Sequence, residues 1–223
     1  MKRGLEEIVS LLQKAGHILI DLPDNEMKDL HRRGTSCVMK SNVQSGGYGV
    51  MEHINASGEP VVPRTATGSP ASFLTTQEVF QNHIVRSGIA AEYNELWMRF
   101  GLDAILAPSV PHPSPPHGTY VSNSYSGIYN MLDYATGCIP ATKTDLKLDV
   151  ATKEWYESNP YPRIEEKRFP YDWGDKEMKE LYKGLEVYKE GRVGLQIVCR
   201  RLREEKVVSI LKEVEALLLQ STC

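Results

Sequence analysis

The 223-residue sequence lacks the motifs that mark many hydrolase and metal sites. It has no G-x-S-x-G run, which excludes the nucleophile turn of the α/β-hydrolases, and no H-E-x-x-H run, which excludes a zinc-peptidase helix. Its six histidines show no ligand spacing, and Gly46-Gly-Tyr-Gly49 lacks the lysine and hydroxyl residue of a phosphate-binding loop. We therefore predict no metal site and no cofactor.

Long apolar runs and a strong charge are absent as well. No stretch of about 18 apolar residues occurs, which argues against a membrane-spanning helix. The net charge is −3 and the basic residues are scattered, so neither nucleic acid nor a membrane is an expected partner. A leader peptide and C-x-x-C pairs are also missing, which favours a cytoplasmic protein with reduced thiols. Cys138 and Cys199 lie in apolar runs and are predicted to be buried and free.

The residues that are present have the balance of an ordinary globular protein. The chain is 41% hydrophobic and 25% charged, which is enough for a core of useful size. Helical apolar periodicity alternates with short apolar runs, a pattern typical of α/β proteins. We predict a single domain over residues 1–223, with a central mixed sheet flanked by helices.

Helices are predicted where apolar residues recur every three to four positions. The clearest one follows Thr75-Thr-Gln-Glu78, a capping-box pattern, and ends at Gly101. Other helices are predicted over residues 5–15, 24–33, 37–51, 126–135, 176–189 and 204–219. Strands are predicted over residues 17–21, 103–108, 138–142 and 193–199. Loops are predicted over residues 59–70 and 108–118, and a surface excursion over residues 143–173.

One group of polar residues is a candidate lining for a pocket. Tyr125 and Tyr129 accompany Asn130 and Asp133, which share a face of the helix predicted there. This face is either the polar rim of a pocket or a structural network that ties the helix to a loop. If it is structural, Asp133→Ala should lower stability by about 1–3 kcal/mol because a buried partner loses its hydrogen bond. If it is the rim of a pocket, Asp133→Ala should leave the melting temperature nearly unchanged and abolish ligand binding or activity.

Five motifs follow one another along nearly the whole chain. They are Leu12-Gln-Lys-Ala-Gly-His17; Gly46-Gly47 with Ser57-Gly-Glu-Pro60; Asp103-Ala-Ile-Leu-Ala-Pro108 with Pro116-His-Gly118; Tyr125-Ser-Gly-Ile-Tyr-Asn-Met-Leu-Asp-Tyr134; and Val193-Gly-Leu-Gln-Ile-Val198 with Glu205-Lys206. In this order they resemble the C-terminal half of the amidase-signature family, in particular its fungal acetamidase-type branch. The chain departs from that pattern at Ala135-Thr136, where the family usually has a proline.

The resemblance implies an amidase fold and the hydrolysis of carboxylic amides to acid plus ammonia or amine. In the family, catalysis uses a Ser–Ser–Lys triad, in which the lysine helps to activate the nucleophilic serine through a bridging serine. Backbone N–H groups of a Gly/Ser-rich loop hold the oxyanion. The lysine and the Gly-Gly-Ser-Ser-Gly run of the family precede the matched region, so we assign no catalytic residue here. The resemblance would place these pocket candidates near the substrate: Gly46, Gly47, Tyr125, Tyr129, Asn130 and Asp133.

Four hypotheses follow. The first is an amidase-like chain that is inactive alone because it lacks the Ser–Ser–Lys machinery. The second is a binding or assembly protein, whose open sheet edge is covered by a partner chain or a second copy. The third is a repurposed small-molecule enzyme that uses the remaining half of the pocket for an amide-like ligand. The fourth is a truncated open reading frame, which a Gly-Gly-Ser-Ser-Gly run upstream of Met1 in the transcript would identify.

Overall fold

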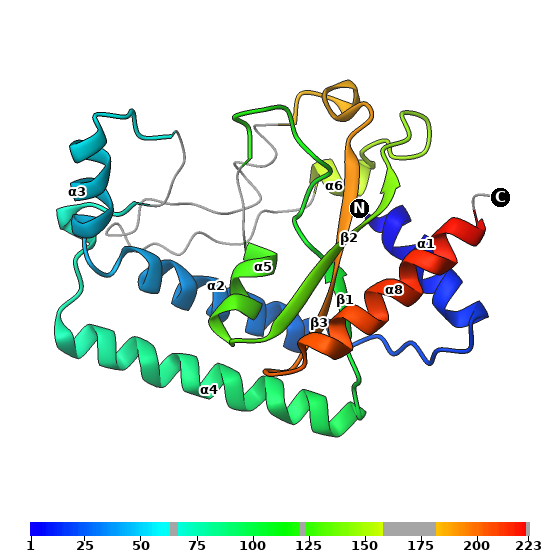
Figure 1. Cartoon of the computed structure of the whole chain (residues 1–223), viewed down its shortest axis with the longest axis horizontal. Coiled ribbons are helices and arrows are strands. Elements are labelled where there is room, and N and C mark those ends of the chain that lie inside the picture. Colours follow the sequence, from blue (N-terminus) through cyan, green and yellow to red (C-terminus); the bar gives the residue numbers. More distant parts are fainter. Residues whose placement is uncertain (63–66, 121–123, 158–181, 222–223) are drawn as a thin grey trace.

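Three strands and the helices around them form the fold (Figure 1). The computed structural model describes residues 1–62, 67–120, 124–157 and 182–221. The helices are α1 (Lys2–Lys14), α2 (Asp24–Val43), α3 (Tyr48–Ser57), η1 (Pro70–Ser72), α4 (Thr76–Phe100), α5 (Ser124–Met131), α6 (Lys153–Glu157), η2 (Leu185–Tyr188) and α8 (Glu204–Ser221). The strands are β1 (Ile105–Pro108), β2 (Ala135–Lys143) and β3 (Arg192–Cys199). This arrangement confirms the predicted α/β fold.

The sheet has the order β1-β3-β2, and β3 lies antiparallel to both neighbours. Ile105 pairs with Val198 on one side of β3, and Ala135 pairs with Cys199 on the other. The mixture of strand directions that the sequence predicts is not seen among these three strands. The strand predicted over residues 17–21 is also wrong: the segment is irregular, and Ile18 is 88% exposed.

Helices cover the two faces of the sheet, and alternate residues of β3 face each layer. Leu195 packs in a cluster with Ile8 of α1 and Val214 of α8. Val198 faces the other way and joins the core formed by α2, α4 and α5, which includes Ile89. Figure 1 shows α1 and α8 together on one side of the strands. The prediction of a central sheet flanked by helices is confirmed.

The long helix α4 begins and ends as its sequence predicts. The Thr75 hydroxyl accepts from the Glu78 backbone N–H, and the Glu78 carboxylate accepts from the Thr75 N–H at 2.7 Å. Gly101 ends the helix with a φ of 60°, a conformation that costs glycine little. Arg33 of α2 donates to Glu92 at 2.8 Å, so the capped helix is also tied to its neighbour α2.

Three other helix predictions need correction. The two helices predicted over residues 24–33 and 37–51 are α2, which runs unbroken to Val43, and α3, which starts after Gly47. The part of the predicted helix 176–189 up to residue 181 lies outside the described residues. Its remainder contains only the 3-10 turn η2, because Gly184 has a φ of 100° that no α-helix contains. Of the predicted excursion over residues 143–173, residues 158–173 also lie outside the described part.

Close packing of α8 on β2 generates a first prediction. A Cβ on Gly137 would lie 2.4 Å from Leu211 Cδ1 and 2.8 Å from Val207 Cγ1, so a larger side chain would push α8 away from the sheet. We expect Gly137→Val to lower the free energy of unfolding in urea by about 1–3 kcal/mol through overpacking. Thr136→Val, at the exposed neighbouring position, is the control and should change the free energy of unfolding little. Equal stability of the two variants would contradict this packing.

Candidate functional site

Helix α5 positions two of the predicted pocket residues against the core. Tyr129 is 6% exposed and lies edge-on to Tyr93 of α4, with ring centroids 6.2 Å apart. Burial raises the pKa of the Tyr129 phenol, so this group stays neutral and cannot serve as a base. The helix approaches α2 closely because Gly34 has no side chain: a Cβ there would lie 3.1 Å from Ile128 Cγ1. Tyr129 is therefore part of the structural core.

Tyr125, at the start of α5, contacts both α2 and β3. Its ring is tilted against that of His31, with centroids 5.0 Å apart. Its backbone carbonyl accepts from Gln196 Nε2 at 3.3 Å, and the same nitrogen donates to the Pro108 carbonyl at 2.7 Å. Gln196 is fully buried, so it ties β3 to the end of β1 and to α5. Sequence reasoning missed this residue, although a single amide within the apolar run of β3 was its signal.

Asn130 and Asp133 lie on the surface and do not share a helical face. The helix ends at Met131, and Asp133 follows it with a left-handed φ of 58°. The predicted helix over residues 126–135 is therefore wrong at its C-terminal end, where β2 already begins at Ala135. The Asp133 carboxylate pairs with Arg201 at 2.8 Å, and both side chains are more than half exposed. Asp133 therefore does not take part in a buried structural network of the kind considered from the sequence.

Gly46 and Gly47 form the turn between α2 and α3, with φ angles of 65° and 78°. A Cβ on Gly47 would lie 2.5 Å from the Thr67 carbonyl oxygen, and one on Gly46 would lie 3.1 Å from that of Ser69. The glycines therefore permit a close backbone approach between this turn and residues 67–69. Figure 1 shows α3 beyond the end of α2, whereas α5 crosses α2 nearer its middle. The six candidates thus lie in two separate places, and their role in a pocket stays a prediction.

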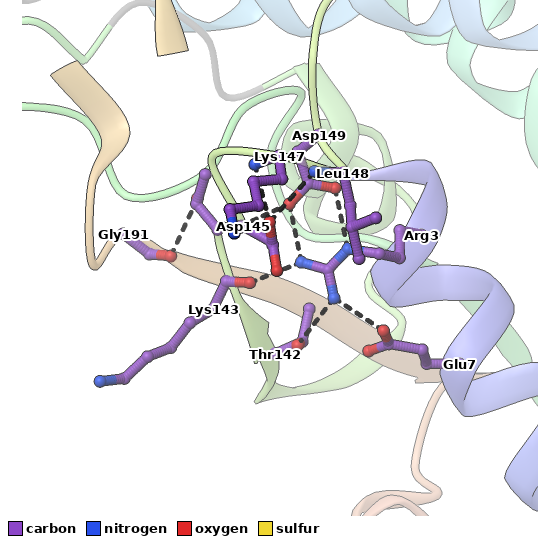
Figure 2. Close-up of polar contacts among 10 residues, drawn as sticks. Arg3, Glu7, Thr142, Lys143, Asp145, Lys147, Leu148, Asp149 and Gly191 are labelled. Atoms are coloured by element: carbon purple, nitrogen blue, oxygen red, sulfur yellow. Dashed lines mark hydrogen bonds and ion pairs between the residues drawn. The ribbon is translucent and has the colours of Figure 1, made fainter. Parts of the chain in front are cut away.

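A polar cluster that the sequence did not reveal surrounds Arg3 (Figure 2). Its Nε and one terminal nitrogen donate to both carboxylate oxygens of Asp149, at 2.9 and 2.7 Å. The remaining N–H groups reach Glu7 at 2.7 Å, the Thr142 hydroxyl at 3.3 Å and the Lys143 carbonyl at 2.6 Å. All five guanidinium donors are thereby used. The hydrogen bonds from Arg3 lower the pKa of the Asp149 carboxyl, which also accepts from the Asp145 backbone N–H.

The cluster links separate elements of the fold, and every N–H group of the Arg3 guanidinium is already used within it. It attaches the first turn of α1 to the loop after β2, and it is mostly buried: the Arg3 and Asp149 side chains are 22% and 14% exposed.

In the part of the chain that the structure describes, the other polar side chains give no metal centre and no reactive thiol. Within the described ranges, no three His, Cys, Asp or Glu side chains are grouped to hold a metal ion. Cys37 and Cys199 are buried, whereas Cys138 is exposed, which corrects the prediction for that residue. Partial burial raises the pKa of the Cys138 thiol, so it lacks the thiolate character of a nucleophile. No helix of the described part is long and apolar enough to cross a membrane.

Comparison with known families assigns the fold. Residues 1–208 match the family model described as amidase. The chain belongs to the amidase family. Its relatives include acetamidases of Emericella nidulans, 28% identical, and of Aspergillus oryzae, 29% identical, each matched over 97% of this chain. The structure also resembles that of a fatty acid amide hydrolase, with a TM-score of 0.80 and 22% identity over 97% of the chain. This likeness shows the fold.

The chain spans only part of the length of these relatives. It covers 38% of each of the two acetamidases and 36% of the fatty acid amide hydrolase chain. The described residues therefore represent a portion of the amidase fold: three strands of its sheet with helices on both faces.

The Arg3 cluster predicts a pH-dependent stability. A carboxyl whose pKa is lowered by folding stabilises the protein above its unfolded pKa of about 3.9, and this contribution is lost as the pH falls through the folded-state pKa. We expect Asp149→Asn to lower the free energy of unfolding by about 2 kcal/mol at pH 7. The difference from the parent chain should shrink below pH 4 in urea titrations. Glu6→Gln, at an exposed carboxylate of α1 that lies 3.8 Å from Lys2, is the control. A pH-independent difference would contradict the ion pair.

The position of Asp133 revises the outcome expected of its replacement. Asp133→Asn keeps a side chain that tolerates the left-handed backbone and removes the exposed ion pair with Arg201. We expect a loss of less than about 1 kcal/mol, as for other surface pairs. Thermal unfolding of Asp133→Asn and Arg201→Gln should give similar small shifts. A loss of several kcal/mol from either variant would show a buried role instead.

Proposed function

We propose that this chain supplies part of the fold of an enzyme that hydrolyses carboxylic amides to acid plus ammonia or amine, and that the 223 residues alone are inactive. The observation that carries the proposal is the amidase match over residues 1–208, combined with coverage of 36–40% of the relatives' length. The sequence contains no Gly-Gly-Ser-Ser-Gly run, which supports the proposal that the serine nucleophile and its lysine lie outside these residues.

In this proposal the chain contributes the framework beside the substrate rather than the reacting groups. Gln196 supports this role, because it holds the start of α5 against β1 and β3 through two hydrogen bonds to backbone carbonyls. A rigid α5 would present Tyr125 and its neighbours as one wall of a pocket for a small amide-like ligand. The lysine amines of Lys143 and Lys206 are each paired with a carboxylate, as expected of surface groups rather than of an activating base.

The alternative of a repurposed enzyme has less support. Its candidate group was Tyr125, Tyr129, Asn130 and Asp133. The structure buries Tyr129 in the core and turns Asp133 outward to Arg201, so these polar groups do not converge on one point. A binding or assembly role is favoured by one observation: Phe80, Ile84 and Met98 of α4 are 62%, 64% and 68% exposed. Such a role is compatible with the proposed function.

The test is an activity and labelling assay of the purified chain. Acetamide, aryl acylamides and a fatty amide serve as substrates, and a fluorophosphonate probe reports any activated serine. Loss of triad members typically lowers the rate by a factor on the order of 10⁴–10⁶, so we expect neither turnover nor labelling above background. The full-length Aspergillus oryzae acetamidase is the positive control. Stoichiometric labelling of one serine with matching turnover would contradict inactivity.

A chimera tests the positive half of the proposal. In it, this chain replaces the matching 38% of the Aspergillus oryzae acetamidase. Acetamide hydrolysis by the chimera would support the framework role. Gln196→Leu in the chimera should reduce the rate of hydrolysis, whereas the control Thr136→Val should leave that rate unchanged. A folded chimera that binds and hydrolyses no amide would count against the framework role.

A further inference from the structure

We draw no further inference here: the strongest candidate, the exposed apolar surface of α3, a helix that has no buried residue and on which Tyr48 and Val50 are 70% and 48% exposed, carries none because nothing in the structure shows what covers it.

Discussion

The pairing of β3 with both of its neighbours is the constraint on which the rest of this structure depends. β1 and β2 do not pair with each other, so each joins this sheet through its hydrogen bonds to β3. Alternate side chains of β3 hold the two helical layers: Leu195 contacts the α1 and α8 layer, and Val198 the layer of α2, α4 and α5. The buried amide of Gln196 adds a polar link from this strand to α5. Packing, register and the position of α5 therefore follow from one strand.

Much of this framework could be predicted because its signals are local. The Thr75 and Glu78 capping box, the periodicity of α4 and the apolar run of β3 each need only a few neighbouring residues to be recognised. The segment 17–21 looked like a strand by the same criteria. A strand, however, exists only when another strand pairs with it, and composition does not reveal that partner. Ile18 is exposed for this reason.

The site was less predictable, because it depends on where a helix stops and on contacts distant in sequence. Asn130 and Asp133 share a face only if the helix continues through residue 133, and it ends at Met131. The Arg3 cluster joins residues that are 146 positions apart, and a lone arginine in an amphipathic helix gives no sign of that. Gly46 and Gly47 did stand out in the sequence, but their closest contacts are with residues 67–69, which the motif itself does not indicate. The family resemblance was needed to connect these segments at all.

The position of β3 along the chain has a consequence for synthesis. This strand (Arg192–Cys199) follows β1 and β2 in the chain, so the ribosome makes it after both of the strands that it joins. The helices α2, α4 and α5 can begin to pack on one another from segments already released, since all three lie within residues 24–131. β1 and β2 must wait, each with unpaired backbone groups and an apolar face in contact with water, until β3 arrives and inserts between them. The nascent chain is thus most exposed to misassociation before β3 has been made.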